Sequence, residues 1–273
     1  MNRTIIIAAA LCLALTASAA PQAGTAPTAK TDSTKQTDRP SDTKRQTIRV
    51  LYMGDSVTDG GWGRSGGSSA PAEQRNKSDL NHNLGHSYVY MCAAVLSAYK
   101  PEKPYEFINR GISGYTLADL ERRWTTDVIG LKPDVLSVLI GINDILAYLD
   151  SGASKPFDWD GWQHRYKALL DSARSANPKL RIILGAPVMA RAGRFATDSA
   201  YTAAHRLVTE CRNRVEQLAK DEGAAFVPYC DIIDDAIRRH PSVKPSHWVW
   251  DGIHPTPAGH SLMARAWVEA CSL

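Results

Sequence analysis

Five short apolar runs, spaced along residues 48–228, constrain the fold more than any other feature of the sequence. The runs span 48–53, 105–109, 134–140, 180–186 and 224–228. The third contains Val135-Leu136-Ser137-Val138-Leu139-Ile140, a nearly continuous apolar stretch that is typical of a strand buried on both faces of a parallel sheet. Between the runs, apolar residues recur every three or four positions, as in amphipathic helices. This alternation predicts an α/β fold, a three-layer α/β/α sandwich around a parallel sheet.

The residues that recur with helical spacing identify the faces expected to pack on the sheet. Four such faces are Leu117, Leu120, Trp124 and Val128; Trp162, Tyr166, Leu169 and Ala173; Ala204, Leu207, Cys211, Val215 and Leu218; and Leu262, Ala266, Trp267 and Ala270. Cys92 and Cys211 fall on apolar helical faces and are interpreted as small core residues. Four cysteines follow the predicted cleavage site, and four oxidised cysteines allow three possible pairings. A disulfide between Cys230 and Cys271 stays open as an alternative.

The first 47 residues differ in composition from the rest of the chain. Residues 1–19 have a basic start, an apolar segment from Ile5 to Leu15 and the small-residue pattern Ala17-Ser18-Ala19 of a signal-peptide cleavage site. That apolar segment is too short to span a bilayer comfortably. Residues 20–47 are rich in Thr, Lys, Asp, Pro and Ala, which predicts a disordered linker. We therefore expect an exported bacterial protein, periplasmic or secreted, with one folded domain at 48–273 and no membrane span after cleavage.

The charge of the chain gives little indication of a charged partner. The formal net charge of +4 falls to about +1 for residues 48–273, because Arg3 and an excess of basic residues in 20–47 supply the remainder. No basic run with interleaved aromatic residues is present in the sequence, so nucleic-acid binding is not expected. Nothing in the sequence indicates an oligomeric state.

A candidate nucleophile follows the first apolar run, in the turn-forming segment Gly54-Asp55-Ser56-Val57-Thr58-Asp59-Gly60. A serine on a sharp turn at the end of a strand presents its hydroxyl to solvent and needs a base nearby to act as a nucleophile. Near the other end of the chain, Asp251-Gly252-Ile253-His254-Pro255 offers that base. Asp251 can reach the second ring nitrogen of His254 from the same turn and orient it. We predict the catalytic residues of a serine esterase: Ser56, His254 and Asp251.

Two further polar segments follow the second and third apolar runs. They are Asn109-Arg110-Gly111-Ile112-Ser113-Gly114 and Gly141-Ile142-Asn143-Asp144. The carboxyl ends of parallel strands lie at one edge of a sheet, where ligands bind in such folds. The Gly114 N–H and the Asn143 side-chain amide, together with the Ser56 N–H, are therefore predicted to form an oxyanion hole.

Each candidate also has a purely structural interpretation. A serine in a tight turn or helix cap is the alternative for Ser56, and a helix cap beside a surface histidine is the alternative for the Asp251 and His254 pair. Gly114 and Asn143 fit the first residues of helices. The competing bases are His247 and His260, but neither lies in the same turn as Asp251. The coincidence of all five residues favours catalysis.

Other residues near these segments are candidates for substrate contact. An aromatic ring beside the nucleophile suits stacking on a sugar, so Trp62 and Trp250 are predicted to bind substrate. Arg110 is a further candidate, with a buried ion pair as its alternative. A metal held by His82 and His86 is not expected, because Asn83 and Gly85 favour a loop over a helix there. Trp62 itself belongs to a Gly- and Ser-rich insertion at 60–84, predicted to be a loop over the carboxyl ends of the strands.

The four segments together resemble, in order, the four sequence blocks of the SGNH (GDSL-type) hydrolase family. They lie in GDSVTDG, NRGISG, GIND and DGIHP, and the resemblance extends over about all of 48–273. The stretch from Gly85 to Trp124 is similar to the bacterial acetylxylan-esterase branch. The family implies a flavodoxin-like five-stranded parallel sheet of order 2-1-3-4-5, with no metal and no organic cofactor. The insertion after Gly60 departs from the core pattern, which leaves the acceptor-side specificity open.

The residues and the resemblance favour an exported carbohydrate O-acetylesterase that acts on acetylated, xylan-like polysaccharide or oligosaccharide. An acetyl group is favoured because no long apolar segment flanks the site, as a fatty acyl chain would require. A periplasmic lysophospholipase or thioesterase of the same fold is the enzymatic alternative. A non-catalytic glycan-binding module is the alternative from another class of protein.

Overall fold

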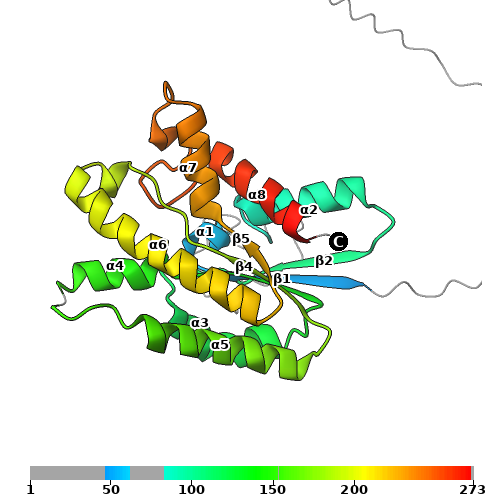
Figure 1. Cartoon of the computed structure of the whole chain (residues 1–273). Coiled ribbons are helices and arrows are strands. Elements are labelled where there is room, and N and C mark those ends of the chain that lie inside the picture. The colour runs from blue at the N-terminus through cyan, green and yellow to red at the C-terminus, as the bar shows by residue number, and fades with distance from the viewer. Residues whose placement is uncertain (1–46, 62–82, 153, 272–273) are drawn as a thin grey trace, which may run out of the picture. The chain divides into compact units, whose positions relative to one another are not determined.

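A parallel five-stranded sheet forms the centre of the computed structural model (Figure 1). Its strands are β1 (Ile48–Gly54), β2 (Tyr105–Asn109), β3 (Val135–Leu139), β4 (Arg181–Gly185) and β5 (Ala225–Val227). Their order across the sheet is β2-β1-β3-β4-β5, and every neighbouring pair is parallel. The predicted α/β class, parallel sheet and strand order are confirmed.

The structure describes residues 47–61, 83–152 and 154–271, all of which belong to one compact unit spanning 43–273. The predicted signal peptide at 1–19 and the predicted linker at 20–47 lie outside the described residues, except for Thr47. Trp62 and His82 lie outside them as well. None of the described helices has both the length and the apolar character needed to cross a membrane.

Helices cover both faces of the sheet. The α-helices are α1 (Ser56–Asp59), α2 (Tyr88–Tyr99), α3 (Leu117–Trp124), α4 (Ile142–Asp150), α5 (Trp159–Ala176), α6 (Asp198–Asp221), α7 (Tyr229–Arg239) and α8 (Pro257–Cys271). A π-helical segment, η3 (Thr125–Ile129), continues α3, and two 3₁₀ segments are η4 (Gly193–Phe195) and η5 (Pro245–His247).

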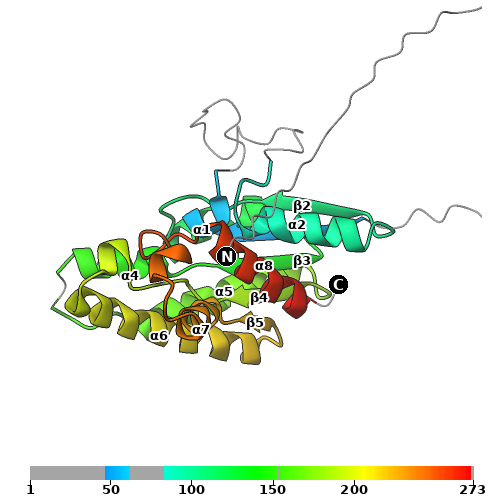
Figure 2. The same cartoon turned by 90° about the horizontal axis from the view of Figure 1, so that it is seen from above.

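The side chains of β1 alternate between two apolar clusters, one on each face of the sheet. Leu51 and Met53 are buried in the cluster formed with α3, α4, α5 and α6. Val50 and Tyr52 are buried in the other, formed with α2, α7 and α8. Figure 2 shows that α2, α8 and α7 lie over this second face in that spatial order, with α2 nearest β2 and α7 nearest β5. Both faces of the central strand are therefore buried, which explains its unbroken apolar run.

The predicted packing faces need one adjustment, on α8. Of the predicted face, Trp267 is buried, whereas Leu262, Ala266 and Ala270 are only partly buried against the same cluster, and the other most buried residues include Met263 and Cys271. Trp267 fixes the rotation of the helix, because its ring nitrogen donates a buried hydrogen bond to Ser137 Oγ of β3 at 2.9 Å. The other three predicted faces agree with the structure, apart from Leu169, which is only partly buried beside buried Leu170.

The cysteines lie in the core. Cys92 and Cys211 are completely buried on α2 and α6, as predicted. Cys230 is a buried free thiol at the start of α7, so the alternative of a Cys230–Cys271 disulfide is wrong. Burial raises the pKa of the thiols of Cys92 and Cys211 well above its usual range, which makes both unreactive.

Candidate active site

The nucleophile candidate lies on a very tight connection between β1 and α1. Gly54 ends the strand, and a Cβ atom there would approach Thr58 Oγ1 to 2.3 Å and the carbonyl oxygen of Leu139 to 2.5 Å. Asp55 then caps α1 by accepting a 3.0 Å hydrogen bond from the N–H of Val57. Gly60 closes the short helix with a φ of 52°. These constraints place Ser56 at the first position of α1, with its side chain only partly buried.

The histidine candidate lies on a turn just before α8. Asp251 Oδ1 accepts hydrogen bonds from the N–H groups of Ile253 at 3.0 Å and His254 at 2.8 Å, which close the turn. Gly252 has a φ of 95°, and a Cβ atom at this position would lie 2.5 Å from the carbonyl oxygen of Ala192. A glycine is therefore needed there for both conformation and space.

Ser56, His254 and Asp251 form a continuous hydrogen-bonded chain. Ser56 Oγ lies 2.8 Å from His254 Nε2, although the two residues are 198 positions apart in the sequence. His254 Nδ1 lies 2.6 Å from Asp251 Oδ2. Burial tends to raise the pKa of Asp251, but hydrogen bonds from the backbone and ring of His254 and from Ile253 N–H bring it below its usual value. An ionised Asp251 holds the proton of His254 on Nδ1 and leaves Nε2 free to accept the serine proton.

Three groups near the ends of β1, β2 and β3 each have an N–H bond without an acceptor among the described residues. Ser56 N–H belongs to the first turn of α1, where no acceptor exists within the helix. Gly114 N–H lies in the connection from β2 to α3, at a φ of 84° and with open space beside its Cα atom. Asn143 Nδ2 donates to the carbonyl oxygen of Tyr115 at 2.9 Å, which leaves its second N–H bond unused. Unused donors of this kind are what an oxyanion hole requires.

Gly114 N–H is conspicuous because its neighbours are all bonded. Hydrogen bonds of 2.8–3.3 Å engage the backbone N–H groups of residues 110, 111, 112, 113, 115, 116 and 117. Their acceptors lie on β1, on the end of β2, on the loop itself and on α1, α3 and α4. The loop is therefore held on all sides, and only its glycine donor is left available to a ligand.

A buried asparagine joins the nucleophile turn to this loop. Asn109 Nδ2 donates to the carbonyl oxygens of Thr58 at 2.8 Å, Asp59 at 3.3 Å and Leu84 at 2.9 Å. Its Oδ1 accepts the N–H of Gly111 at 2.9 Å. Sequence reasoning gave Asn109 no role. Its position as the last residue of β2, where the chain turns into the loop, was the one signal that could have singled it out.

Two carboxyl groups close to the site, the buried Asp55 and the partly buried Asp144, have raised pKa values. Asp55 is 1% exposed, and burial raises its pKa to about 7, against the lowering effects of the Val57 N–H and of His254. Burial also raises the pKa of Asp144 to about 6. Asp144 accepts hydrogen bonds from Leu117 N–H and from the ring nitrogen of Trp162, so it joins α3, α4 and α5. Both carboxyl groups therefore maintain the positions of the elements around the site.

The competing histidines are placed differently from His254. His260 is on α8, and its Nδ1 accepts the N–H of Tyr88 at 3.1 Å. Burial, followed by repulsion from His254, lowers the pKa of His260 to about 4, so its ring is neutral at pH 7. His247 is exposed on η5, with its ring against Trp248. The imidazole that bonds to Ser56 Oγ is that of His254.

The remaining predicted substrate-binding residues have contrasting environments. Trp250 is 61% exposed, and its ring lies nearly parallel to that of His254, with 6.3 Å between the ring centroids and 25° between the planes. Arg110 is 8% exposed and lies 3.9 Å from Asp127, as in the alternative of a buried ion pair. Trp62 lies outside the described residues. Trp250 is therefore the described aromatic residue that a ligand at His254 would meet first.

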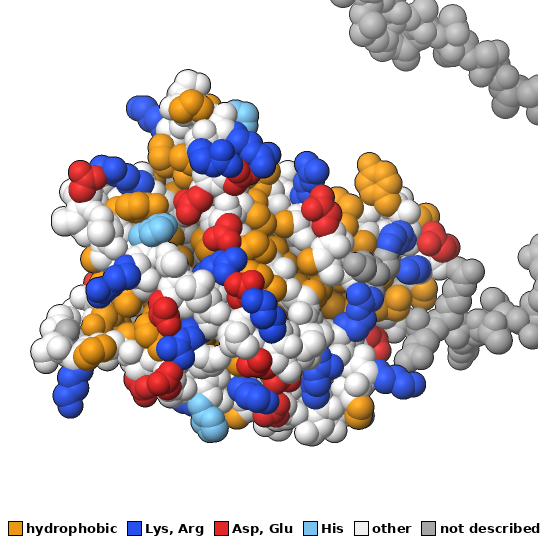
Figure 3. Space-filling model, in the orientation of Figure 1, with side chains coloured by type: hydrophobic (Ala, Val, Ile, Leu, Met, Phe, Trp, Pro, Cys, Tyr) orange, Lys and Arg blue, Asp and Glu red, His pale blue; other side chains and the backbone are white. Residues whose placement is uncertain are grey.

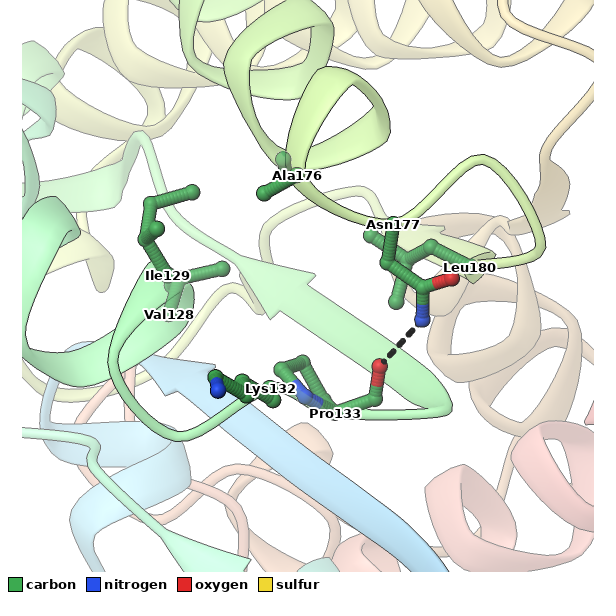
Figure 4. A pocket seen from close by; sticks show the side chains of 8 residues that line it. Val128, Ile129, Lys132, Pro133, Ala176, Asn177 and Leu180 are labelled. Carbon is green, nitrogen blue, oxygen red and sulfur yellow. Dashed lines mark hydrogen bonds between the residues drawn. The ribbon is translucent and has the colours of Figure 1, made fainter.

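A separate hollow lies at the opposite, amino-terminal end of β3 and β4 (Figure 4). It has a volume of about 440 Å³, and its lining includes Val128, Ile129, Ala176 and Leu180. Asn177 crosses one side and donates a 3.0 Å hydrogen bond to the carbonyl oxygen of Pro133. No serine or histidine lines this hollow, so it offers no chemistry for acyl transfer.

No cluster of three or more metal-ligating side chains occurs in the part of the chain that the structure describes. On the face shown in Figure 3, basic and acidic side chains are interspersed and form no continuous stripe of one sign. The expectation of no metal and no organic cofactor stays a prediction.

Comparison with known proteins gives consistent matches. The profile of the GDSL-like lipase/acylhydrolase family matches residues 52–262. An acetylxylan esterase from Geobacillus stearothermophilus is 30% identical over 223 residues, which cover 81% of this chain and 92% of that protein. The crystal structure of a GDSL-like protein from Parabacteroides merdae has a TM-score of 0.70 at 31% identity, covering 82% of this chain and 95% of the other. Axe2, an acetylxylan esterase from G. stearothermophilus, has a TM-score of 0.64 at 29% identity, covering 83% and 94%.

Proposed function

The chain belongs to the GDSL-like lipase/acylhydrolase family and is a carboxylic ester hydrolase, and we propose that it removes O-acetyl groups from xylan-type carbohydrate through Ser56, His254 and Asp251. The observation that carries this proposal is the chain of two hydrogen bonds, 2.8 Å and 2.6 Å long, from Ser56 Oγ through the ring of His254 to Asp251. Structures of catalytic mutants of Axe2 have alanine in place of a serine, an aspartate or a histidine, and the same three residue types form this chain.

The first half of the proposed reaction transfers the acetyl group to Ser56. As Ser56 Oγ attacks the ester carbonyl carbon, His254 Nε2 takes the hydroxyl proton, and the resulting imidazolium is stabilised by the Asp251 carboxylate. The carbonyl oxygen becomes an oxyanion, which accepts hydrogen bonds from Ser56 N–H, Gly114 N–H and Asn143 Nδ2. The bond between the acetyl carbon and the sugar oxygen then breaks. His254 gives its proton to that oxygen, which leaves as the sugar hydroxyl group.

The second half regenerates the enzyme. Water gives a proton to His254 Nε2 and attacks the acetyl-serine carbonyl, and the oxyanion forms again opposite the same three donors. The bond to Ser56 Oγ breaks, His254 returns the proton to the serine, and acetic acid leaves. Every proton transfer passes through one ring nitrogen, which explains why its tautomer must be fixed by Asp251.

Similarity to acetylxylan esterases and the exposed ring of Trp250 support an acetylated carbohydrate as the substrate. An indole ring offers a flat apolar surface on which a sugar ring can stack while its hydroxyl groups stay in water. We also propose that the enzyme is exported to the periplasm or the cell exterior, a proposal supported by the signal-peptide pattern of residues 1–19.

The test is acetate release by the full-length protein from acetylated xylo-oligosaccharides. Ser56→Ala is expected to lower kcat by about 10⁴- to 10⁶-fold, because no other group replaces the nucleophile. Ser175→Ala, on the exposed side of α5, is the matched control and is expected to leave kcat unchanged. An Ser56→Ala variant that retains activity would contradict the mechanism.

The acyl group is tested separately with p-nitrophenyl esters of increasing chain length. Acetate is expected to be hydrolysed with a higher kcat/KM than octanoate. A preference for octanoate, together with fatty-acid release from lysophospholipid and no activity on acetylated xylan, would instead identify a lysophospholipase. Binding of xylan without any hydrolysis would identify a glycan-binding module.

A further inference from the structure

We infer that Asp59 is a positioning residue for the oxyanion hole, because its carboxylate ties the residue before Gly114 to the helix that carries Ser56. Asp59 ends α1, and its side chain is completely buried. Its Oδ2 accepts two hydrogen bonds of 2.9 Å, one from the backbone N–H and one from the hydroxyl of Ser113. This inference rests on the proposed function, in which Gly114 N–H binds the oxyanion.

The geometry explains why a side chain is needed at this point. Ser113 and Gly114 are exposed, so apolar packing does not hold them against the body of the protein. The hydrogen bond from Ile112 N–H to the carbonyl oxygen of Gly54 anchors the loop just before them. Beyond that anchor, the Asp59 carboxylate is the acceptor for Ser113, and the next residue is the glycine donor itself.

The same carboxylate also braces the nucleophile turn. Asp59 Oδ1 accepts the N–H of Gly61 at 3.0 Å, so one group binds the chain on both sides of the proposed oxyanion site. A carboxylate can accept all three hydrogen bonds, and charge-assisted bonds of this type are stronger than those between neutral groups. Asp59 therefore sets the distance between two of the three proposed donors, Ser56 N–H and Gly114 N–H.

Asparagine at position 59 tests this role with little change of volume. The amide has one oxygen and one NH₂ group, so it cannot accept the bonds of both Ser113 and Gly61. We expect Asp59→Asn to lower kcat for p-nitrophenyl acetate by about 10- to 100-fold, because a donor displaced by an ångström loses most of its effect on the transition state. KM is expected to stay within about 3-fold, since the ground-state ester uses these donors less.

A second readout separates positioning from a general structural role. A short alkylboronic acid forms a tetrahedral adduct with the serine oxygen, and its Ki is expected to rise in Asp59→Asn by the same factor as kcat/KM falls. A variant that is merely unstable would lose active protein while Ki for the remaining fraction stayed unchanged. Titration of active sites by the acetyl-enzyme burst measures that fraction.

Asp119, in the first turn of α3, is a matched control that binds the end of the same loop. Its Oδ2 accepts hydrogen bonds from the backbone N–H and the hydroxyl of Thr116, at 2.8 Å and 2.6 Å, in the same arrangement that Asp59 forms with Ser113. Thr116 lies beyond Gly114 and begins α3, so this pair caps a helix. Asp119→Asn is expected to lower stability without changing kcat or Ki for the boronic acid.

The outcomes distinguish this inference from the proposed function. Suppose that Ser56→Ala is inactive but Asp59→Asn keeps the wild-type kcat and Ki. The inferred role of Asp59 is then wrong, and the serine mechanism stands. The same conclusion follows if Asp119→Asn lowers kcat and raises Ki as much as Asp59→Asn does. If Ser56→Ala stays active, the proposed function itself is wrong. Should Asp59→Asn fail to fold, Ser113→Ala removes only the hydroxyl bond. It is expected to lower kcat by about 3-fold, with recovery in Ser113→Thr; an unchanged kcat in Ser113→Ala would then overturn the inference.

Discussion

The two segments that supply the proposed catalytic residues differ sharply in burial. On the nucleophile side, Asp55, Thr58, Asp59 and Asn109 are all at most 1% exposed and lie in a buried polar network. On the histidine side, the side chains of Asp251 and His254 are 25% and 38% exposed, and Trp250 is 61% exposed. The partly buried Ser56 is therefore supported by fully buried polar groups, whereas the proposed base and its partner lie nearer the surface.

The difference in burial indicates that the two segments have different roles. Buried polar groups are costly unless every hydrogen bond is formed, so the network of Asn109 and Asp59 tolerates few alternative arrangements. A rigid arrangement suits donors that must fit a developing negative charge. The histidine turn is closed by hydrogen bonds among residues 251–254 and is tied to residues 190 and 194 by two backbone hydrogen bonds of 3.1 Å, while its side chains meet the solvent. We expect substitutions on the histidine side to change catalysis or binding, and substitutions on the nucleophile side to change stability as well.

The largest effect is expected from Asp251→Asn. The asparagine oxygen can still accept the N–H groups of Ile253 and His254, but its NH₂ group would face His254 Nδ1. The ring proton would then move to Nε2, which could no longer accept the proton of Ser56. We expect kcat to fall by about 10⁴-fold, with a change in unfolding free energy of less than about 1 kcal/mol. Steady-state kinetics and urea denaturation measure the two quantities.

A second aspartate–histidine pair provides the control. Asp234 Oδ2 lies 3.7 Å from His205 Nε2 on the surface formed by α6 and α7. Asp234→Asn is expected to leave kcat unchanged. If Asp251→Asn lowered stability by several kcal/mol, the histidine turn would be as tightly integrated as the nucleophile turn, and the comparison above would be wrong.

On the nucleophile side, we expect Asp55 to make stability depend on pH. Burial raises its pKa to about 7, whereas in the unfolded chain the carboxyl group ionises near its ordinary pKa of 3.8. Between these values the folded state retains a proton that the unfolded state has lost, so the contribution of Asp55 to stability falls as pH rises. Asp55→Asn has no carboxyl group to ionise and so lacks this pH-dependent loss of stability. As pH rises between the two pKa values, the unfolding free energy of the variant relative to wild type should increase by up to about 1.4 kcal/mol per pH unit. Urea denaturation at pH 4.5, 5.5, 6.5 and 7.5 provides the measurement.

His260 provides a comparison of opposite sign. Its pKa is lowered to about 4 from 6.5, so the unfolded state binds a proton that the folded state does not, and its contribution to stability falls as pH decreases through this window. The stability of His260→Gln relative to wild type should therefore rise toward low pH. For Asp55→Asn, a difference in unfolding free energy from wild type that stays constant across the pH series would contradict this prediction. It would mean that Asp55 is ionised in the folded protein and that its surroundings are more hydrated than its burial indicates.

Much of this architecture follows from the sequence, because the patterns involved are local. Apolar runs specify strands buried on both faces, and turn residues after them mark the edge where the site lies. The predicted face of α8 contained the buried Trp267, but the centre of the buried face lies nearer Met263 and Cys271, and a long-range hydrogen bond from Trp267 to Ser137 fixes this rotation. A period of 3.6 cannot distinguish adjacent faces of a helix that is partly buried on several sides.

The supporting polar groups escaped prediction for a similar reason. Asn109 and Asp59 stand within the recognised segments, but their partners are mainly backbone atoms of other segments, which carry no side-chain signature. Arg110 had two interpretations in the sequence, and only the position of Asp127, 3.9 Å away, favours the ion pair. Residue types indicate chemistry, whereas the assignment of supporting contacts requires the folded arrangement.

The smallest effect is expected from Trp250→Ala, which tests the exposed end of the histidine turn. With 61% of the residue exposed, its removal should change the unfolding free energy by less than about 0.5 kcal/mol. Loss of a stacking surface is expected to raise KM for acetylated xylo-oligosaccharides by about 5-fold, or about 1 kcal/mol, whereas the kinetics with p-nitrophenyl acetate change little. Trp250→Phe should recover part of the affinity.

Tyr99→Ala is the control for this variant, because Tyr99 is an 82% exposed aromatic residue at the end of α2. It should leave both KM values unchanged. If Trp250→Ala instead raised KM equally for both substrates, the ring would act through the orientation of His254, against which it lies at a centroid distance of 6.3 Å. The ring of Trp250 would then hold the histidine side in position, as Asn109 holds the nucleophile side. The two sides would differ less in rigidity than the comparison of their burial indicates.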